Sequence, residues 1–150
     1  FFEVHGLGMN ANELSANKDL TGFSVQDLNR HPALDFEDNR FDAVICSLSV
    51  EYLTDPVRVL AEISRVVKSG GRVAVSFSNR WFPEKNIRIW ADLHEFERVG
   101  LVLSWFQASK EFENLSTSSF RGYPRPVADR YFPGLRLSDP IFGVTGTAKG

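Results

Sequence analysis

The alternation of apolar and polar positions divides the first half of the chain into short apolar runs separated by polar loops. Runs at residues 1–7, 22–28, 41–50 and 72–78 have the length of strands. The run at 41–50 is nearly continuous, which is typical of a strand buried on both faces of a parallel sheet. We therefore predict four strands here, with a short helix over 9–17 between the first two.

A helical face is the clearest periodic feature of the chain. Within 55–70 the apolar side chains recur at 56, 59, 60, 63, 66 and 67, which places them on one side of a helix. Asp55 suits the N-cap and Pro56 the first helical position. Lys68 suits the last turn and Gly70 a left-handed stop, so the sequence predicts a helix between these limits.

The remaining half changes character after the fourth strand. Residues 83–108 are predicted to be mostly helical, and two strand-like runs follow at 112–120 and 139–148. No helix of useful length separates these last strands, so we expect an antiparallel pair. One apolar face of the predicted helical region carries Phe96, Val99, Val102, Leu103 and Phe106. The order of elements predicts one α/β domain over 1–150, with a Rossmann-like doubly wound sheet that is mostly parallel and closes on an antiparallel C-terminal pair.

Composition narrows the classes of protein that fit. The chain has 150 residues, 43% hydrophobic and 24% charged, which suits one globular domain. A net charge of −2 gives no electrostatic case for nucleic acid or an anionic membrane as partner. No apolar run has the roughly 20 residues of a membrane span, and no signal peptide is visible, so the cytoplasm is the default expectation and an organelle stays open. Cys46 is the single cysteine, and three scattered histidines lack ligand spacing, so we expect no metal site.

The stretch "VHGLGMNANEL" contains Gly6-x-Gly8-x-x-Ala11, the fingerprint of a dinucleotide-binding turn. Asp27, 19 residues beyond Gly8, would be the matching acid. An NAD-linked oxidoreductase is therefore one interpretation. The fingerprint alone occurs by chance, however, and the helix predicted after it is too short for a Rossmann crossover.

Residues 34–76 resemble the core of the class I S-adenosylmethionine-dependent methyltransferases of the small-molecule, type 11-like group. The resemblance rests on the run Leu34–Asp42 into a strand, on Asp55-Pro56 at a helix start, and on "RVVKSGG" at 65–71 before the next strand. It implies transfer of a methyl group from S-adenosyl-L-methionine to a small-molecule acceptor. A non-catalytic binding or scaffold protein with a degenerate methyltransferase fold is the alternative.

The resemblance also implies residues for the cofactor. The family acid that binds the ribose hydroxyls falls on Gly8, which has no acceptor, while Met9 would pack on adenine and Asn10 would partly replace the acid. Asp27 would accept from the adenine amino group and Leu28 would offer its backbone N–H. The alternative for Asp27 is a turn aspartate that caps the following loop.

The methionine end and the acceptor site are implied further along. The backbone of Ser47 and Leu48 would lie beside the methionine portion, and Tyr52, after Glu51, would line the methyl-transfer site. Asn79 ends the next strand and would face the substrate. Plain core packing is the alternative for Ser47, Leu48 and Tyr52, and no catalytic residue is assigned.

Two absences bear on the resemblance. The first strand of the family and its glycine-rich loop, which holds the methionine end of the cofactor, have no counterpart in the chain, so we expect a domain truncated at its N-terminus. No Asn-Pro-Pro-Tyr motif follows the 41–50 strand, which argues against methylation of nucleic-acid bases. The methyl acceptor and the oligomeric state are left undecided.

Overall fold

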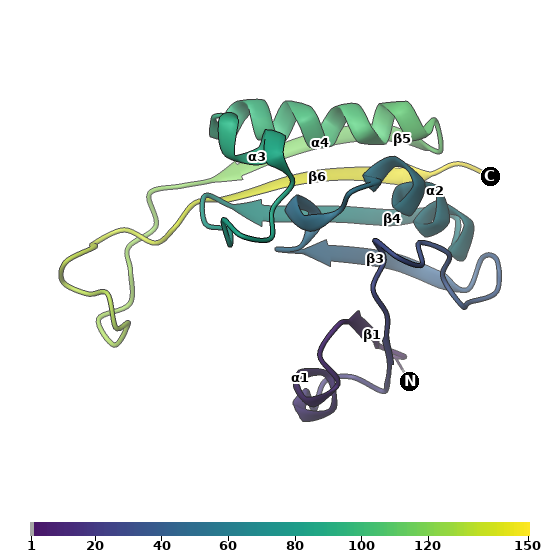
Figure 1. The fold of residues 1–150 in the computed structure, drawn as a ribbon, viewed down its shortest axis with the longest axis horizontal. Helices are drawn as coiled ribbons and strands as arrows, with labels where there is room; N and C mark the ends of the chain where they lie inside the picture. The colour runs from purple at the N-terminus through teal and green to yellow at the C-terminus, as the bar shows by residue number, and fades with distance from the viewer. Residues whose placement is uncertain (1) are drawn as a thin grey trace.

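The computed structural model describes residues 2–150, which form strands and helices in the predicted alternating order (Figure 1). The elements are β1 (His5–Gly8), α1 (Ala11–Ala16), β2 (Gly22–Val25), β3 (Phe41–Ser47), the 3-10 helix η1 (Val50–Tyr52), α2 (Pro56–Val66), β4 (Val67–Ser78), α3 (Arg88–Asp92), α4 (Glu95–Ser109), β5 (Phe112–Phe120) and β6 (Ile141–Ala148).

The strands form two sheets. The larger has the order β3-β4-β6-β5, in which β3 and β4 are parallel while β6 is antiparallel to both β4 and β5. The smaller sheet is the parallel pair β1-β2, which lies below β3 in Figure 1. The predicted α/β class and its antiparallel closing pair are confirmed.

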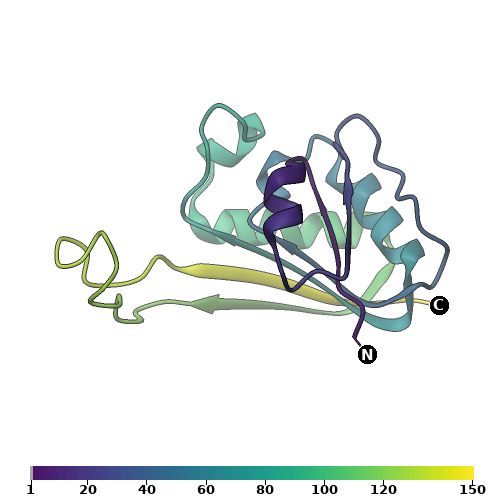
Figure 2. The same ribbon diagram turned by 90° about the horizontal axis from the view of Figure 1, so that it is seen from below.

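The core lies between the larger sheet and the helices α2 and α4, which Figure 2 shows on one side of that sheet. On the apolar face of α4, Val99, Val102 and Phe106 are buried, whereas Phe96 is exposed. The fully buried side chains at the centre are Val59, Val73, Val75, Phe77, Trp90, Val102, Phe106, Phe142 and Val144.

Helix α2 begins as its sequence predicts and ends earlier. Asp55 is the N-cap, and its Oδ1 accepts from the backbone N–H of Arg58 at 3.2 Å, with Pro56 following. The helix stops at Val66, because the chain turns directly into β4, and Lys68 lies outside it and pairs with Asp42 at 2.7 Å.

Gly70 is left-handed as predicted, with a φ of 78°, but it does not end the helix. It lies near the start of β4, where the pairing with β3 shifts between Phe41↔Val67 and Ala43↔Arg72. The extra residues of β4 are accommodated as an irregularity, and glycine permits the positive φ there.

The prediction that the apolar run at 41–50 forms a strand buried on both faces is wrong for β3. None of its residues is buried, and the Ile45 side chain is 75% exposed. The reason is its position: β3 is an edge strand that pairs with β4 alone among residues 2–150. The β1 and β2 strands are also shorter than the predicted runs, so residues 27 and 28 lie in the turn after β2.

The N-terminal unit is held to the rest of the chain by the loop 29–40. Arg40 forms an ion pair with Glu3. The ring of Phe36 meets His5 and Phe41 edge-on, each with ring centroids 4.9 Å apart. These contacts fix the small sheet relative to β3 at the end of the strands opposite to the candidate site.

Candidate functional site

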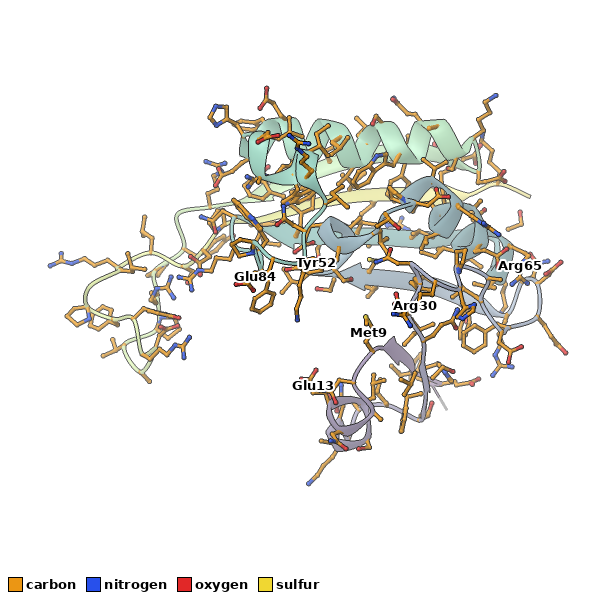
Figure 3. All side chains as sticks on the ribbon, viewed as in Figure 1. Met9, Glu13, Arg30, Tyr52, Arg65 and Glu84 are labelled. Carbon is orange, nitrogen blue, oxygen red and sulfur yellow. The ribbon has the colours of Figure 1, made fainter. Side chains whose placement is uncertain are left out.

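The carboxyl ends of β2 and β3 meet through one asparagine. The Asn29 side chain donates from Nδ2 to the carbonyl oxygen of Tyr52 at 2.9 Å, and its Oδ1 accepts from Thr54 N at 2.9 Å. Asn29 lies in the turn after β2, whereas Tyr52 and Thr54 follow β3. Figure 3 shows Met9 and Tyr52 on this side of the molecule and Arg65 toward the opposite end of the sheet. In open α/β sheets, ligands bind at this carboxyl edge.

A cleft of about 570 Å³ runs between the small sheet and β3. Its walls are mostly apolar, with Ser47 and Ser49 among the polar residues, and it follows the edge of β3 that no strand of residues 2–150 pairs. Other lining residues are Val4, His5, Gly6, Leu7, Leu28, Ala43, Val44, Ile45 and Cys46.

Gly8 ends β1 at this edge. A Cβ built there would meet the Leu14 side chain at 3.6 Å, an ordinary van der Waals distance, and the φ of Gly8 lies outside the left-handed region. The position therefore accepts a side chain, although glycine offers no acceptor for a ribose. Met9, the next residue, is 72% exposed, so its thioether is free to cover a flat ring.

Asn10 caps helix α1. Its Oδ1 accepts from the backbone N–H of Asn12 at 3.0 Å and of Glu13 at 3.4 Å. The oxygen predicted to replace the family acid in part is thus already engaged by the helix. Only the Nδ2 donor of Asn10 is left for a ligand, which does not replace a carboxylate.

The geometry of Asp27 matches its alternative interpretation, a turn aspartate that caps the following loop. Its Oδ1 accepts from Asn29 N at 3.0 Å, and its Oδ2 lies 3.5 Å from Arg30 Nε. The carboxylate therefore caps its own turn, beside Leu28, which lines the cleft. Each oxygen has a second lone pair, so capping leaves acceptor capacity.

The backbone after β3 is unusual at Leu48. This residue has a φ of 51°, in the left-handed region that a leucine rarely adopts, while its N–H donates to Ser76 O at 2.8 Å. Ser47 lines the cleft and accepts from the Ser76 hydroxyl at 3.1 Å. Such conformations cost about 1–3 kcal/mol and cluster at functional sites. The backbone of Leu48, and not its side chain, is therefore the feature that points to a functional role.

Glu51 is a buried acid at the same edge. Its side chain is 1% exposed, and its Oε2 has no hydrogen-bond partner among residues 2–150. Burial raises the pKa of Glu51, and the buried Arg98 opposes this rise through its positive charge. Arg98 donates from Nε to Trp90 O at 2.9 Å and lies 4.0 Å above the Trp81 ring. Burial lowers the pKa of Arg98 as well.

The segment 79–87 is fastened over this acid. Tyr52 Oη accepts from Phe82 N at 3.0 Å, and Glu51 O accepts from Ile87 N at 2.9 Å. Asn79, at the start of the segment, has a buried Oδ1 without a partner in the described part of the chain. The structure thus brings together Tyr52 and the segment that Asn79 opens, which the sequence implied as substrate-facing residues. It adds two buried charged side chains, Glu51 and Arg98, of which the second lowers the pKa of the first through its charge.

Cys46 supplies no nucleophile. Its Sγ lies 3.3 Å from Ser49 Oγ, and burial raises the pKa of the thiol, which disfavours the thiolate. Within residues 2–150 no three metal-binding side chains gather around a common point. No helix of that part of the chain combines the length and hydropathy needed to span a bilayer.

Comparison with known proteins agrees with this architecture. The family described as "Methyltransferase domain" matches residues 3–75. The chain is 35% identical over 90 residues to a ubiquinone/menaquinone biosynthesis C-methyltransferase of Burkholderia cenocepacia, covering 59% of this chain and 36% of that protein. It is 28% identical over 119 residues to the mitochondrial 2-methoxy-6-polyprenyl-1,4-benzoquinol methylase of Caenorhabditis elegans, covering 77% of this chain and 42% of the relative.

A solved structure shows the same fold. Phosphoethanolamine N-methyltransferase 2 of Haemonchus contortus, in complex with phosphomonomethylethanolamine and S-adenosylhomocysteine, superposes with a TM-score of 0.60 at 13% identity. The match covers 99% of this chain and 44% of that one. The chain spans less than half the length of these relatives.

Proposed function

Because the chain belongs to the class I S-adenosylmethionine-dependent methyltransferases, we propose that the protein transfers a methyl group from S-adenosyl-L-methionine to a small molecule. The observation that carries the proposal is the Asn29 bridge, which sets the turn after β2 beside η1 at the carboxyl edge of the strands. One curated relative is named as a methylase of a benzoquinol and another as a C-methyltransferase of ubiquinone/menaquinone biosynthesis, so we propose a hydroxylated aromatic ring as the acceptor class.

The residues at this edge fit an adenosine-bearing cofactor in part. Met9 would cover the adenine, Asp27 and Leu28 would bind its edge, and the backbone at Ser47 and Leu48 would face the methionine end. The left-handed backbone of Leu48, directly after β3, supports this assignment. When bound, the cofactor supplies a methyl group on a positively charged sulfur.

The chain's own residues would position the acceptor and keep water out. In-line displacement depends mainly on holding two reactants together, and loss of charge during the reaction favours a dry site. Tyr52 and Phe82, with ring centroids 6.4 Å apart, form an aromatic wall at the edge where the acceptor would bind. Because burial raises its pKa, Glu51 has a greater tendency to hold a proton than an exposed glutamate.

The test is a comparison of two ligands on the protein made from its complete coding sequence. S-adenosylhomocysteine at a hundredfold excess over Kd should stabilise the fold by about 2.7 kcal/mol, seen as a rise in melting temperature. Asp27→Asn keeps an oxygen that caps the turn and removes the charge, so it should shrink the rise. Asp35→Asn, an exposed site, is the matched control. A larger rise with NAD would overturn the proposal.

A second candidate is a scaffold that has lost the cofactor. Two observations favour it: Gly8 has no acceptor, and the Asn10 oxygen is engaged as a helix cap. A well-folded protein that responds to neither S-adenosylhomocysteine nor NAD, and transfers no radiolabelled methyl group to a hydroxylated aromatic acceptor, would support this candidate.

A further inference from the structure

The connection between β5 and β6 forms an arm, residues 121–140, that projects beyond the sheet (Figures 1 and 2). It leaves from the carboxyl edge, since Ile141 at the start of β6 pairs with Ser78 at the end of β4. The arm is therefore on the same edge of the sheet as Asn79 and the segment that follows it.

The arm is ordered by its own polar contacts. Arg125 is buried, and it donates from Nε to Leu137 O at 3.1 Å and from Nη1 to Asp129 Oδ2 at 3.2 Å. Asp139 at the base pairs with Arg80 at 3.0 Å, which ties the arm to the segment after β4. A loop held in this way presents a fixed outer surface.

Large apolar side chains are exposed on the arm. Val127 is 78% exposed and Tyr123 60%, and Leu135 and Leu137 are about half exposed. No part of the described chain covers them. Large apolar side chains exposed together on an ordered loop indicate a surface that interacts with another protein or with a membrane.

The charge of the arm opposes the charge of the rest of the chain. Four arginines and two aspartates give the arm a net charge of +2, whereas the whole chain has −2. Both aspartates are paired with arginines, at Arg125 and Arg80. Arg130 and Arg136 are exposed and lie within 4 Å of no carboxylate among residues 2–150. The arm therefore carries a local positive charge although the chain as a whole is negative.

We propose that the arm docks on the surface of an anionic lipid bilayer, with Val127, Tyr123 and Leu135 entering the interface and Arg130 and Arg136 binding headgroup phosphates. Aliphatic side chains beside uncompensated arginines match a lipid interface better than a nucleic acid, which is bound by stacking and phosphate contacts. Docking would place the carboxyl edge of the sheet, and any acceptor site there, next to the membrane.

Sedimentation with lipid vesicles tests the membrane docking of the arm, using the protein made from its complete coding sequence. No cofactor or acceptor is added, so the result does not depend on the proposed methyl transfer. The protein should sediment with vesicles containing phosphatidylglycerol and much less with phosphatidylcholine alone, and added salt should weaken binding. Arg130→Gln and Arg136→Gln should each lower the partition coefficient about fivefold. Arg58→Gln, an exposed arginine on α2, is the control and should leave it unchanged.

The apolar contribution is tested without altering charge. The double variant Val127→Ser/Leu135→Ser should lower the partition coefficient about tenfold, while Ile89→Ser, an exposed apolar site outside the arm, should not. Absence of sedimentation with anionic vesicles, or sedimentation indifferent to the arm variants, would overturn the proposal. So would arm-dependent dimerisation in light scattering, or arm-dependent retention of an oligonucleotide, in a protein that ignores vesicles.

Discussion

Gly8 offers the sharpest test of the proposed cofactor site, because the structure has room for a side chain at this position. A side chain at Gly8 would touch Leu14 at van der Waals distance, and the backbone there needs no glycine. Gly8→Asp should therefore fold and place a carboxylate at the end of β1. The two oxygens of this carboxylate would accept hydrogen bonds from the two ribose hydroxyls, which glycine cannot do.

The expected magnitude follows from the strength of one charge-assisted contact. A hydrogen bond to a charged group contributes about 1.5–3 kcal/mol, which corresponds to roughly a 10- to 150-fold lower Kd for S-adenosylhomocysteine. Gly8→Ala tests the effect of a side chain alone and should leave Kd nearly unchanged. Gly8→Asn supplies one neutral acceptor and should fall between the two.

Calorimetric titration of the protein from its complete coding sequence measures these constants, and circular dichroism confirms that each variant is folded. Gly6→Ala is a contrasting control for packing, because a Cβ there would lie 2.5 Å from a Leu20 side-chain carbon and should lower stability. A folded Gly8→Asp protein with an unchanged Kd would refute the placement of the ribose at this strand end.

Three further variants test the fold and its charges. Arg65→Ala should lower the free energy of unfolding in urea by about 2–4 kcal/mol, because its guanidinium donates to the carbonyl oxygens of residues 34 and 36 and to two carboxylates, while Arg58→Ala should change it little. Phe77→Ala, at a fully buried site, should lower it by about 3–5 kcal/mol. Glu51→Gln should stabilise the protein at about pH 8 and have no effect near pH 4. The pKa of Glu51 is raised in the folded state, so the stability of the unchanged protein falls as the pH rises from the unfolded pKa through the folded pKa. Equal changes in stability at both pH values would refute the burial of a charge at Glu51.

The sequence predicted those elements whose pattern is local. Helix α2 is specified by Asp55, Pro56 and the apolar face that they precede, and these features need no information from distant residues. Its end was misplaced because Val66 and Val67 are both apolar and buried, yet the first closes the helix and the second opens β4. Periodicity does not distinguish a buried helix end from a buried strand start.

The candidate site depended on contacts that periodicity does not contain. Glu51 and Arg98 are 47 positions apart and are buried by the packing of distant elements, so neither was predicted as a buried charge. The left-handed backbone of Leu48 has no sequence signature either, because leucine rarely adopts it. By contrast, the resemblance placed its cofactor residues at the ends of β1, β2 and β3, and the structure brings the segments after β2 and β3 together through Asn29.

The open edges of β1 and β3 lead to the last prediction. Apolar content predicted burial of β3, yet its outer edge faces the cleft, and the small sheet lines the other wall. Leu48 N donates to β4, so by alternation the amides of Ala43, Ile45 and Ser47 point to the open edge. An apolar parallel strand between the two sheets would pair both edges.

We propose that the complete coding sequence supplies this strand upstream of residue 1, followed by a turn containing glycine or serine. Hydrogen exchange gives a direct measurement, because paired amides exchange only when the strand opens. The amides of Ala43, Ile45 and Ser47 should exchange rapidly in the 150-residue chain and slowly in the full-length protein. Amides of β6, paired on both sides in either protein, serve as the internal reference. Equally rapid exchange of the β3 edge in both proteins, or a transcript without an apolar upstream segment, would show that the two sheets stay separate and would favour a degenerate scaffold.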